Sequence, residues 1–206
     1  MKELQQALSE IHSIRNQVAQ GTEFRGYGPA SIAASGILAL LVAAAQSQWM
    51  AKPGKANLTV WLGVWGGTAV TSMLLTGIET LTRSRRMHVG FAREMVQSAV
   101  AQFLPAIMVG FLLTIVMMRA AAEECWMLPG LWELIFSLGV FASCRFLPRH
   151  MFGVGVWYLG AGIFCLAAAS TTRTLSPWAM GIPFGVGQLL VAAVLRFGYG
   201  ERFEQA

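Results

Sequence analysis

Six long apolar stretches follow one another along the chain, separated by short polar or charged segments. Each is about 18 to 24 residues long, close to the roughly 20 residues that an α-helix needs to cross the hydrocarbon core of a bilayer. The pattern predicts an all-α fold, a polytopic bundle of six transmembrane helices in one membrane domain over residues 27–198. The expected spans are 29–49, 58–78, 95–118, 130–147, 153–170 and 178–197.

Buried helices of a soluble protein are the competing explanation for these stretches. Hydrophobic residues make up 55% of the 206 and charged residues 12%, against roughly 25% charged residues in an ordinary soluble domain. So few charges cannot form a polar shell around six apolar helices, and lipid is the natural solvent for such a surface. We therefore expect the lipid bilayer to be the main partner.

The two ends of the chain are polar. Residues 199–206 are expected to form a cytoplasmic tail, and residues 1–26 a cytoplasmic segment with an amphipathic helix over 1–20. The helix is indicated by apolar side chains at spacings of three and four: Leu4, Leu8, Ile11, Ile14 and Val18. It is not strongly basic, so it would dock on the bundle or pair with a second copy rather than bind anionic lipid. It lacks the apolar core of a cleavable signal peptide, so the first span would act as the insertion signal.

The net charge of +5 would fit nucleic-acid binding in a soluble protein. Here the basic residues lie beside apolar stretches, where they set topology, and we expect no nucleic-acid partner. With the N-terminus inside, eleven Lys and Arg residues fall in inner segments and four in outer ones, namely Lys52, Lys55, Arg119 and Arg173. This bias predicts a protein of the cell membrane, a bacterial inner membrane, with both termini in the cytoplasm.

The densest basic run lies between the second and third spans, in an expected loop over 79–94. It comprises Arg83, Arg85, Arg86 and Arg93. Such a run can contact lipid phosphates or an acidic cytoplasmic partner. More often it only fixes topology.

Glu133 is the one acidic residue that falls within an expected span. A carboxylate in hydrocarbon costs on the order of a few kcal/mol, so such residues usually face the bundle interior or a wet cavity and mark a solute or ion path. Glu133 lies only about one turn after Pro129 and Gly130, where it could instead reach interfacial water or interact with the helix N-terminus. The sequence leaves both interpretations open, and the second is the commoner one.

The sixth span contains an unusual cluster of small residues and proline just before Gln188. The cluster comprises Gly181, Pro183, Gly185 and Gly187. One interpretation is a discontinuous helix whose freed backbone carbonyls line a polar path. The commoner one is close helix packing through Gly181 and Gly185, with one interhelical hydrogen bond from Gln188.

Two other spans carry weaker signals. Gln102 lies three residues before Pro105 in the third span, where the proline predicts a kink. Gly63 and Gly67 lie four residues apart in the second span and would let another helix approach closely. Because six helices enclose little space, such a face favours a homo-oligomer.

No combination of residues in the sequence is typical of a catalytic or cofactor site. No span carries a nucleophile–base pair, and the chain has no phosphate-binding loop or His-Glu-x-x-His pair. His12, His88 and His150 fall outside the spans, where they could not ligate haem within the bilayer. Cys125 and nearby methionines are soft ligands, but they lack the regular spacing of a copper site. We expect no catalytic residue, no cofactor and no metal site.

The leading interpretation is a non-enzymatic membrane protein that transports, conducts or binds a small solute. Glu133, Gln102, Gln188 and the 181–187 segment would line its path. The alternative is a membrane anchor or accessory subunit that docks a cytoplasmic or membrane partner through residues 1–20 and the 83–93 loop. An intramembrane enzyme is third, and no motif identifies a family.

Overall fold

The computed structural model describes residues 28–50, 57–86, 90–144 and 150–197, and gives only the backbone for 80–81, 83–86, 90–100 and 197. The expected amphipathic helix and the C-terminal tail lie outside these residues. So do the side chains of Arg83, Arg85, Arg86 and Arg93. The predictions that depend on them, including the anchor interpretation, stay predictions.

The described chain is helical throughout its regular elements, and six of its helices are long and apolar enough to cross a membrane. The predicted all-α six-helix bundle is confirmed, and the protein is a multi-pass helical membrane protein. The elements are α2 (Pro29–Met50), α3 (Leu58–Arg86), α4 (Gly90–Ala120), the 3₁₀ helix η1 (Ala122–Met127), α5 (Leu128–Ser143), α6 (Met151–Thr172) and α7 (Trp178–Phe197).

Local chemistry explains several helix boundaries. Asn57 caps α3, because its Oδ1 accepts a hydrogen bond from the Thr59 N–H at 2.8 Å. Pro129 lies in the first turn of α5, where its missing N–H costs nothing. Arg173 ends α6 in the left-handed conformation, with φ of 49°, and its N–H donates to the Ala169 carbonyl at 2.7 Å.

Three helix ends differ most from those expected. The basic segment 79–94 is not one loop, because α3 continues to Arg86 and α4 begins at Gly90. Helical hydrogen bonding therefore extends beyond the apolar stretches at both of these ends. α5 ends at Ser143, four residues before the expected end of the fourth span.

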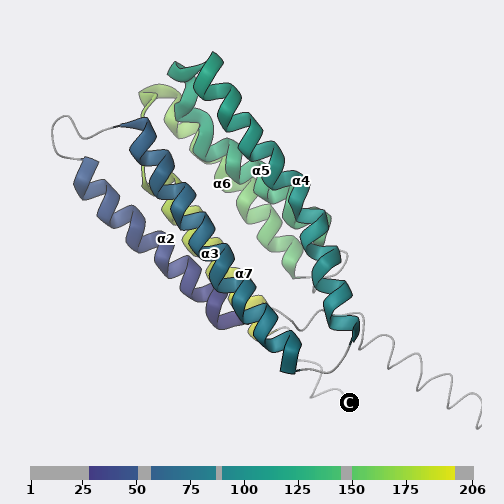
Figure 1. Cartoon of the computed structure of the whole chain (residues 1–206). Helices are drawn as coiled ribbons and strands as arrows, with labels where there is room; N and C mark the ends of the chain where they lie inside the picture. Colours follow the sequence, from purple (N-terminus) through teal and green to yellow (C-terminus); the bar gives the residue numbers. More distant parts are fainter. Residues whose placement is uncertain (1–27, 51–56, 87–89, 145–149, 198–206) are drawn as a thin grey trace, which may run out of the picture.

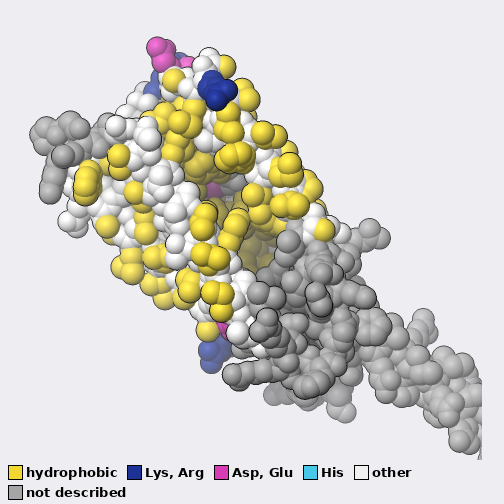
Figure 2. Space-filling model, viewed as in Figure 1, with side chains coloured by type: hydrophobic (Ala, Val, Ile, Leu, Met, Phe, Trp, Pro, Cys, Tyr) yellow, Lys and Arg dark blue, Asp and Glu magenta, His cyan; other side chains and the backbone are white. Residues whose placement is uncertain are grey.

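The helices run side by side along one long axis (Figure 1). α2 packs mainly on α7, α5 packs on both α4 and α6, and α6 also contacts α7. α3 packs on α2 and makes little contact with α4, the next helix in the chain. Figure 2 shows a hollow between α3 and α4, with an acidic side chain visible at its floor. Buried residues make up 11% of the α3 span and 6% of the α4 span, against 28% or more of each of the other four spans.

Glycines set the two closest helix contacts. A Cβ placed on Gly36 of α2 would lie 2.8 Å from the Gly185 carbonyl of α7, and Gly181 lies against Ala43 of α2. A Cβ on Gly130 of α5 would lie 2.8 Å from the carbonyl of Gly162 on α6. Such contacts bring backbones together in lipid, where van der Waals packing replaces the hydrophobic effect.

Gly63 and Gly67 have a different environment. A Cβ on either would meet no atom within 4 Å, so neither faces another described part of the chain. Their predicted role in helix packing is therefore not fulfilled by the described helices, and a partner molecule would have to supply the contact.

We expect leucine in place of Gly162 to destabilise the bundle, because its side chain would have to displace the Gly130 carbonyl and Leu134, which lie 2.8 Å and 3.0 Å from the Cβ position. Overpacking of this kind costs about 1–3 kcal/mol. The measurement is the apparent melting temperature of the purified protein in detergent. The matched control is Gly160→Leu on the same helix, since Gly160 faces open space. Equal losses in the two variants would contradict a tight α5–α6 contact.

Candidate functional site

Glu133 lies in the second turn of α5 and is fully buried, with 0% of its surface exposed. Its Oε1 is 3.9 Å from the Sγ of Cys165 on α6, and its Oε2 has no hydrogen-bond partner. No cationic side chain among the described residues forms an ion pair with it. Of the two interpretations of Glu133, the observed position matches the one facing the bundle interior.

The position of Glu133 follows from the contact between Gly130 and Gly162. Gly130 and Gly162 bring α5 and α6 together one turn before Glu133. Helical side chains tilt toward the N-terminus of their own helix. The carboxyl group of Glu133 therefore reaches back along α5 to Cys165, three residues after Gly162.

Cys165 also contacts α7, where a proline leaves a backbone acceptor without its helical donor. Pro183 has no N–H, so the carbonyl of Ala179, four residues earlier, loses its usual bond. The Cys165 thiol lies 3.5 Å from this carbonyl and donates to it. The Nε1–H of Trp157 donates to the carbonyl of Pro183 itself at 3.0 Å.

The α7 helix remains continuous through this region, from Trp178 to Phe197. Of the two interpretations of this segment, the discontinuous helix is therefore wrong, and Cys165 of α6 supplies a donor in place of the missing N–H. α4 is likewise continuous through Pro105.

The Glu133 carboxyl group, the Cys165 thiol and the Ala179 carbonyl can form one hydrogen-bond chain. A thiol has a single proton, and when Cys165 donates it to Ala179 it cannot donate to Glu133. Its sulfur can still accept weakly, so a protonated Glu133 can donate to Cys165, which donates to the Ala179 carbonyl. An unpaired carboxylate at this depth would be costly. The arrangement can thus accommodate a proton on Glu133.

Tyr158 extends the polar group further along α6. It is fully buried, and its hydroxyl lies near the Gln188 amide and within electrostatic range of Glu133, but makes no hydrogen bond of good geometry. A side chain on Gly187 would collide with the Tyr158 ring, so this glycine makes room for the tyrosine. The rings of Phe136 and Phe184 pack on Tyr158, with centroids 4.6 Å and 5.6 Å away.

The structure separates the residues expected on one path into groups. Glu133 and Gln188 both lie near Tyr158. Pro183 contributes indirectly, because it leaves the Ala179 carbonyl free to accept from Cys165. Gly181 and Gly185 face α2 instead. Gln102 lies on α4, and its Oε1 is buried without a partner, but no described contact joins it to Glu133.

Sequence reasoning missed Cys165, Tyr158 and Trp157. A signal for two of them was present, because Tyr158, Gly162 and Cys165 recur at spacings of four and three on one helical face. Nothing in the sequence indicated that this face meets Glu133.

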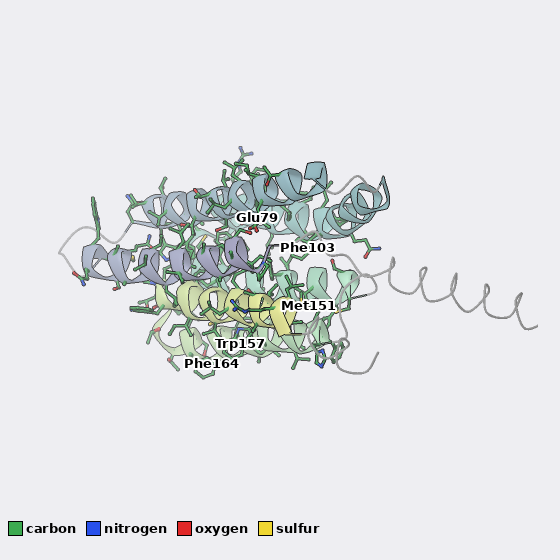
Figure 3. The ribbon with its side chains drawn as sticks, turned by 90° about the horizontal axis from the view of Figure 1, so that it is seen from below. Glu79, Phe103, Met151, Trp157 and Phe164 are labelled. Carbon is green, nitrogen blue, oxygen red and sulfur yellow. The ribbon has the colours of Figure 1, made fainter. Side chains whose placement is uncertain are left out.

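A groove of about 720 Å³ runs between α6 and α7 and reaches the first turn of α5. Cys165 and Ala179 form part of its wall, so Glu133 lies directly behind this wall. Figure 3 shows Trp157 and Phe164, which also line the groove, toward the edge of the bundle away from Glu79 of α3.

Comparisons with protein-family models, curated proteins and solved structures give no match for the chain. The site must therefore be interpreted from its own geometry. Within the described ranges, no three His, Cys, Asp or Glu side chains lie together as metal ligands would.

We expect Cys165→Ala to destabilise the protein, because it leaves the Ala179 carbonyl without a donor. A buried polar group that loses its partner costs about 1–3 kcal/mol. The loss should be smaller when position 183 also carries alanine, since that residue restores the N–H for Ala179. The measurement is a double-mutant cycle of unfolding free energies in detergent. Strictly additive effects of the two substitutions would mean that the thiol does not substitute for the missing N–H.

Proposed function

We propose that the protein moves a small solute across the membrane and that Glu133 is the carboxyl group on which this movement depends. The observation that carries the proposal is a fully buried carboxyl group with no cationic partner among the described residues. Ionisable residues inside membrane bundles are rare, because their desolvation costs several kcal/mol, and they mark ion pathways and proton relays.

The weak contacts of Glu133 support a carrier role over a structural one. An arginine partner would hold the carboxylate permanently, as buried ion pairs do. A thiol at 3.9 Å is a polar contact that is easily exchanged. Proton and solute would therefore compete for the same carboxyl group, which couples the movement of one to that of the other.

The orientation in the membrane is part of the same proposal. The positive-inside bias places both termini in the cytoplasm of a bacterial cell, with the connection between α3 and α4 at the inner surface. Arg83, Arg85, Arg86 and Arg93 would then lie at the level of lipid phosphates.

We expect Glu133→Gln to abolish solute-driven proton movement, because glutamine keeps the size of the side chain and cannot ionise. The measurement uses proteoliposomes with an entrapped pH-sensitive dye and a panel of small amines, other organic cations, amino acids and sugars. Glu123→Gln, at an exposed position of η1, is the matched control and should behave as wild type. The proposal fails if no solute moves protons in the wild type, or if the Glu133 variant moves them equally well.

A homo-oligomer built on α3 is a second part of the proposal. α3 is mostly exposed, and Gly63 and Gly67 face open space on it. Small residues four apart are common where two transmembrane helices meet. A second copy is the simplest occupant of such a face.

Leucine at Gly67 should then convert the oligomer to monomer without lowering the melting temperature of the chain. Single-molecule photobleaching in bilayers counts the subunits directly. Gly160→Leu serves as the comparison, because Gly160 faces open space on α6. A monomeric wild type, or an oligomer that survives Gly67→Leu, would exclude this face as the interface.

A further inference from the structure

The α6–α7 groove has the size and openness of a ligand site rather than of a packing defect. Its volume of about 720 Å³ lies within the roughly 300–1,000 Å³ of small-molecule sites. It is lined by residues of η1, α5, α6 and α7, and the polar ones lie toward the end where α6 stops. These are Thr172, Thr174 and Ser176.

Four aromatic rings line the groove, and two of them are fixed through their N–H groups. The wall includes Trp126, Trp157, Phe164 and Trp178. The Trp126 Nε1–H donates to Glu124 Oε2 at 2.8 Å, and the Trp157 Nε1–H donates to the Pro183 carbonyl at 3.0 Å. With these donors occupied, the two indoles offer the groove their rings rather than their N–H groups. Ring faces attract cations.

The charged side chains around the groove are few. Its lining contains no Lys, Arg or His, and Glu133 lies behind Cys165 in its wall. At one end of the groove, the partial negative charge of the last α6 carbonyls near Thr172 is opposed by the partial positive charge of the α7 N-terminus at Trp178. Arg173 is the nearest cation in sequence, but it is 67% exposed and pairs with Glu124 at 3.8 Å. The lining therefore offers an anion no cationic side chain.

We infer that this groove binds a lipophilic organic cation, a bulky apolar body with one positive charge, that enters from the bilayer. The inference rests on the proposed function and names its substrate class. The body fills the aromatic groove, and the charge faces the Cys165 wall. When the carboxyl group of Glu133 is ionised, the cation on the groove side of Cys165 balances its negative charge. A neutral acyl chain would fit the lining but would gain nothing from Glu133.

Two large ions of nearly the same shape and opposite charge test the inference. Tetraphenylphosphonium and tetraphenylborate are added to the full chain in lipid nanodiscs, and saturable binding is measured at equilibrium. The phosphonium ion should bind at least about tenfold more tightly than the borate. Equal binding of the two ions would mean that only apolar contact is involved, and would overturn the inference.

Substitutions of Glu133 test whether the preference for the cation over the anion depends on this one carboxyl group. Glu133→Gln should remove the preference for the cation, and Glu133→Asp should restore part of it, because aspartate keeps the charge. Glu123→Gln should leave the preference unchanged. If the Glu133→Gln protein still folds by its melting temperature and still prefers the cation, the inference is wrong.

Cys165 reports the location of the bound ion. In a chain with Cys125→Ser and Cys144→Ser, Cys165 is the one remaining thiol. Its alkylation by a membrane-permeant maleimide should slow severalfold with tetraphenylphosphonium and remain unchanged with tetraphenylborate. Binding of the cation without protection of Cys165 would place it outside this groove and contradict the inference.

Failure of the inference is distinguishable from failure of the proposed function. If Glu133→Gln abolishes proton-coupled flux of some other solute while both tetraphenyl ions bind alike, transport stands and the substrate class is wrong. If the cation binds selectively through Glu133 but no solute moves protons, the binding site stands and transport is wrong.

Discussion

A bilayer offers no water to a backbone carbonyl, so every carbonyl in a transmembrane helix needs a partner from the protein. Pro183 violates this requirement in the second turn of α7, because it cannot donate to Ala179. The thiol of Cys165 meets it from the neighbouring helix at 3.5 Å. The candidate site depends on this one replacement, since the same sulfur is the polar contact of Glu133.

The close helix contacts make the replacement geometrically feasible. A thiol is short, and it reaches a carbonyl on another helix only where the two backbones lie near each other. The Gly130–Gly162 contact holds α5 against α6, and the α2–α7 contact through Gly36 and Gly185 supports α7 from its other side. The glycine contacts thus bring Glu133, Cys165 and the Ala179 carbonyl together, although none of these groups belongs to a glycine.

The sequence predicted the architecture well, because span length is a property of the bilayer rather than of side-chain packing. A run of about 20 apolar residues has few alternatives to a transmembrane helix. Glu133 could also be identified from sequence, since a carboxyl group in such a run is rare. The angular position of each helix could not, because it is decided by packing between spans. Gly63 and Gly67 therefore looked like packing residues and face open space, while Gly162 was overlooked and lies against Gly130 in the α5–α6 contact. The donor to the Ala179 carbonyl is Cys165, which lies 18 residues before Pro183 in the chain, and nothing in the sequence paired the two.

The weakness of the Glu133 contacts is itself informative about function. A structural carboxyl group in hydrocarbon would be expected to have several strong partners, because its burial must be offset at all times. Glu133 instead has a distant thiol on one oxygen and no partner on the other. A protonated carboxyl group tolerates this environment at modest cost, whereas a carboxylate does so only when a cation is present. The site is therefore suited to alternate between two occupants, a proton and a cation, and the aromatic groove on the far side of Cys165 offers the second of these a place to bind.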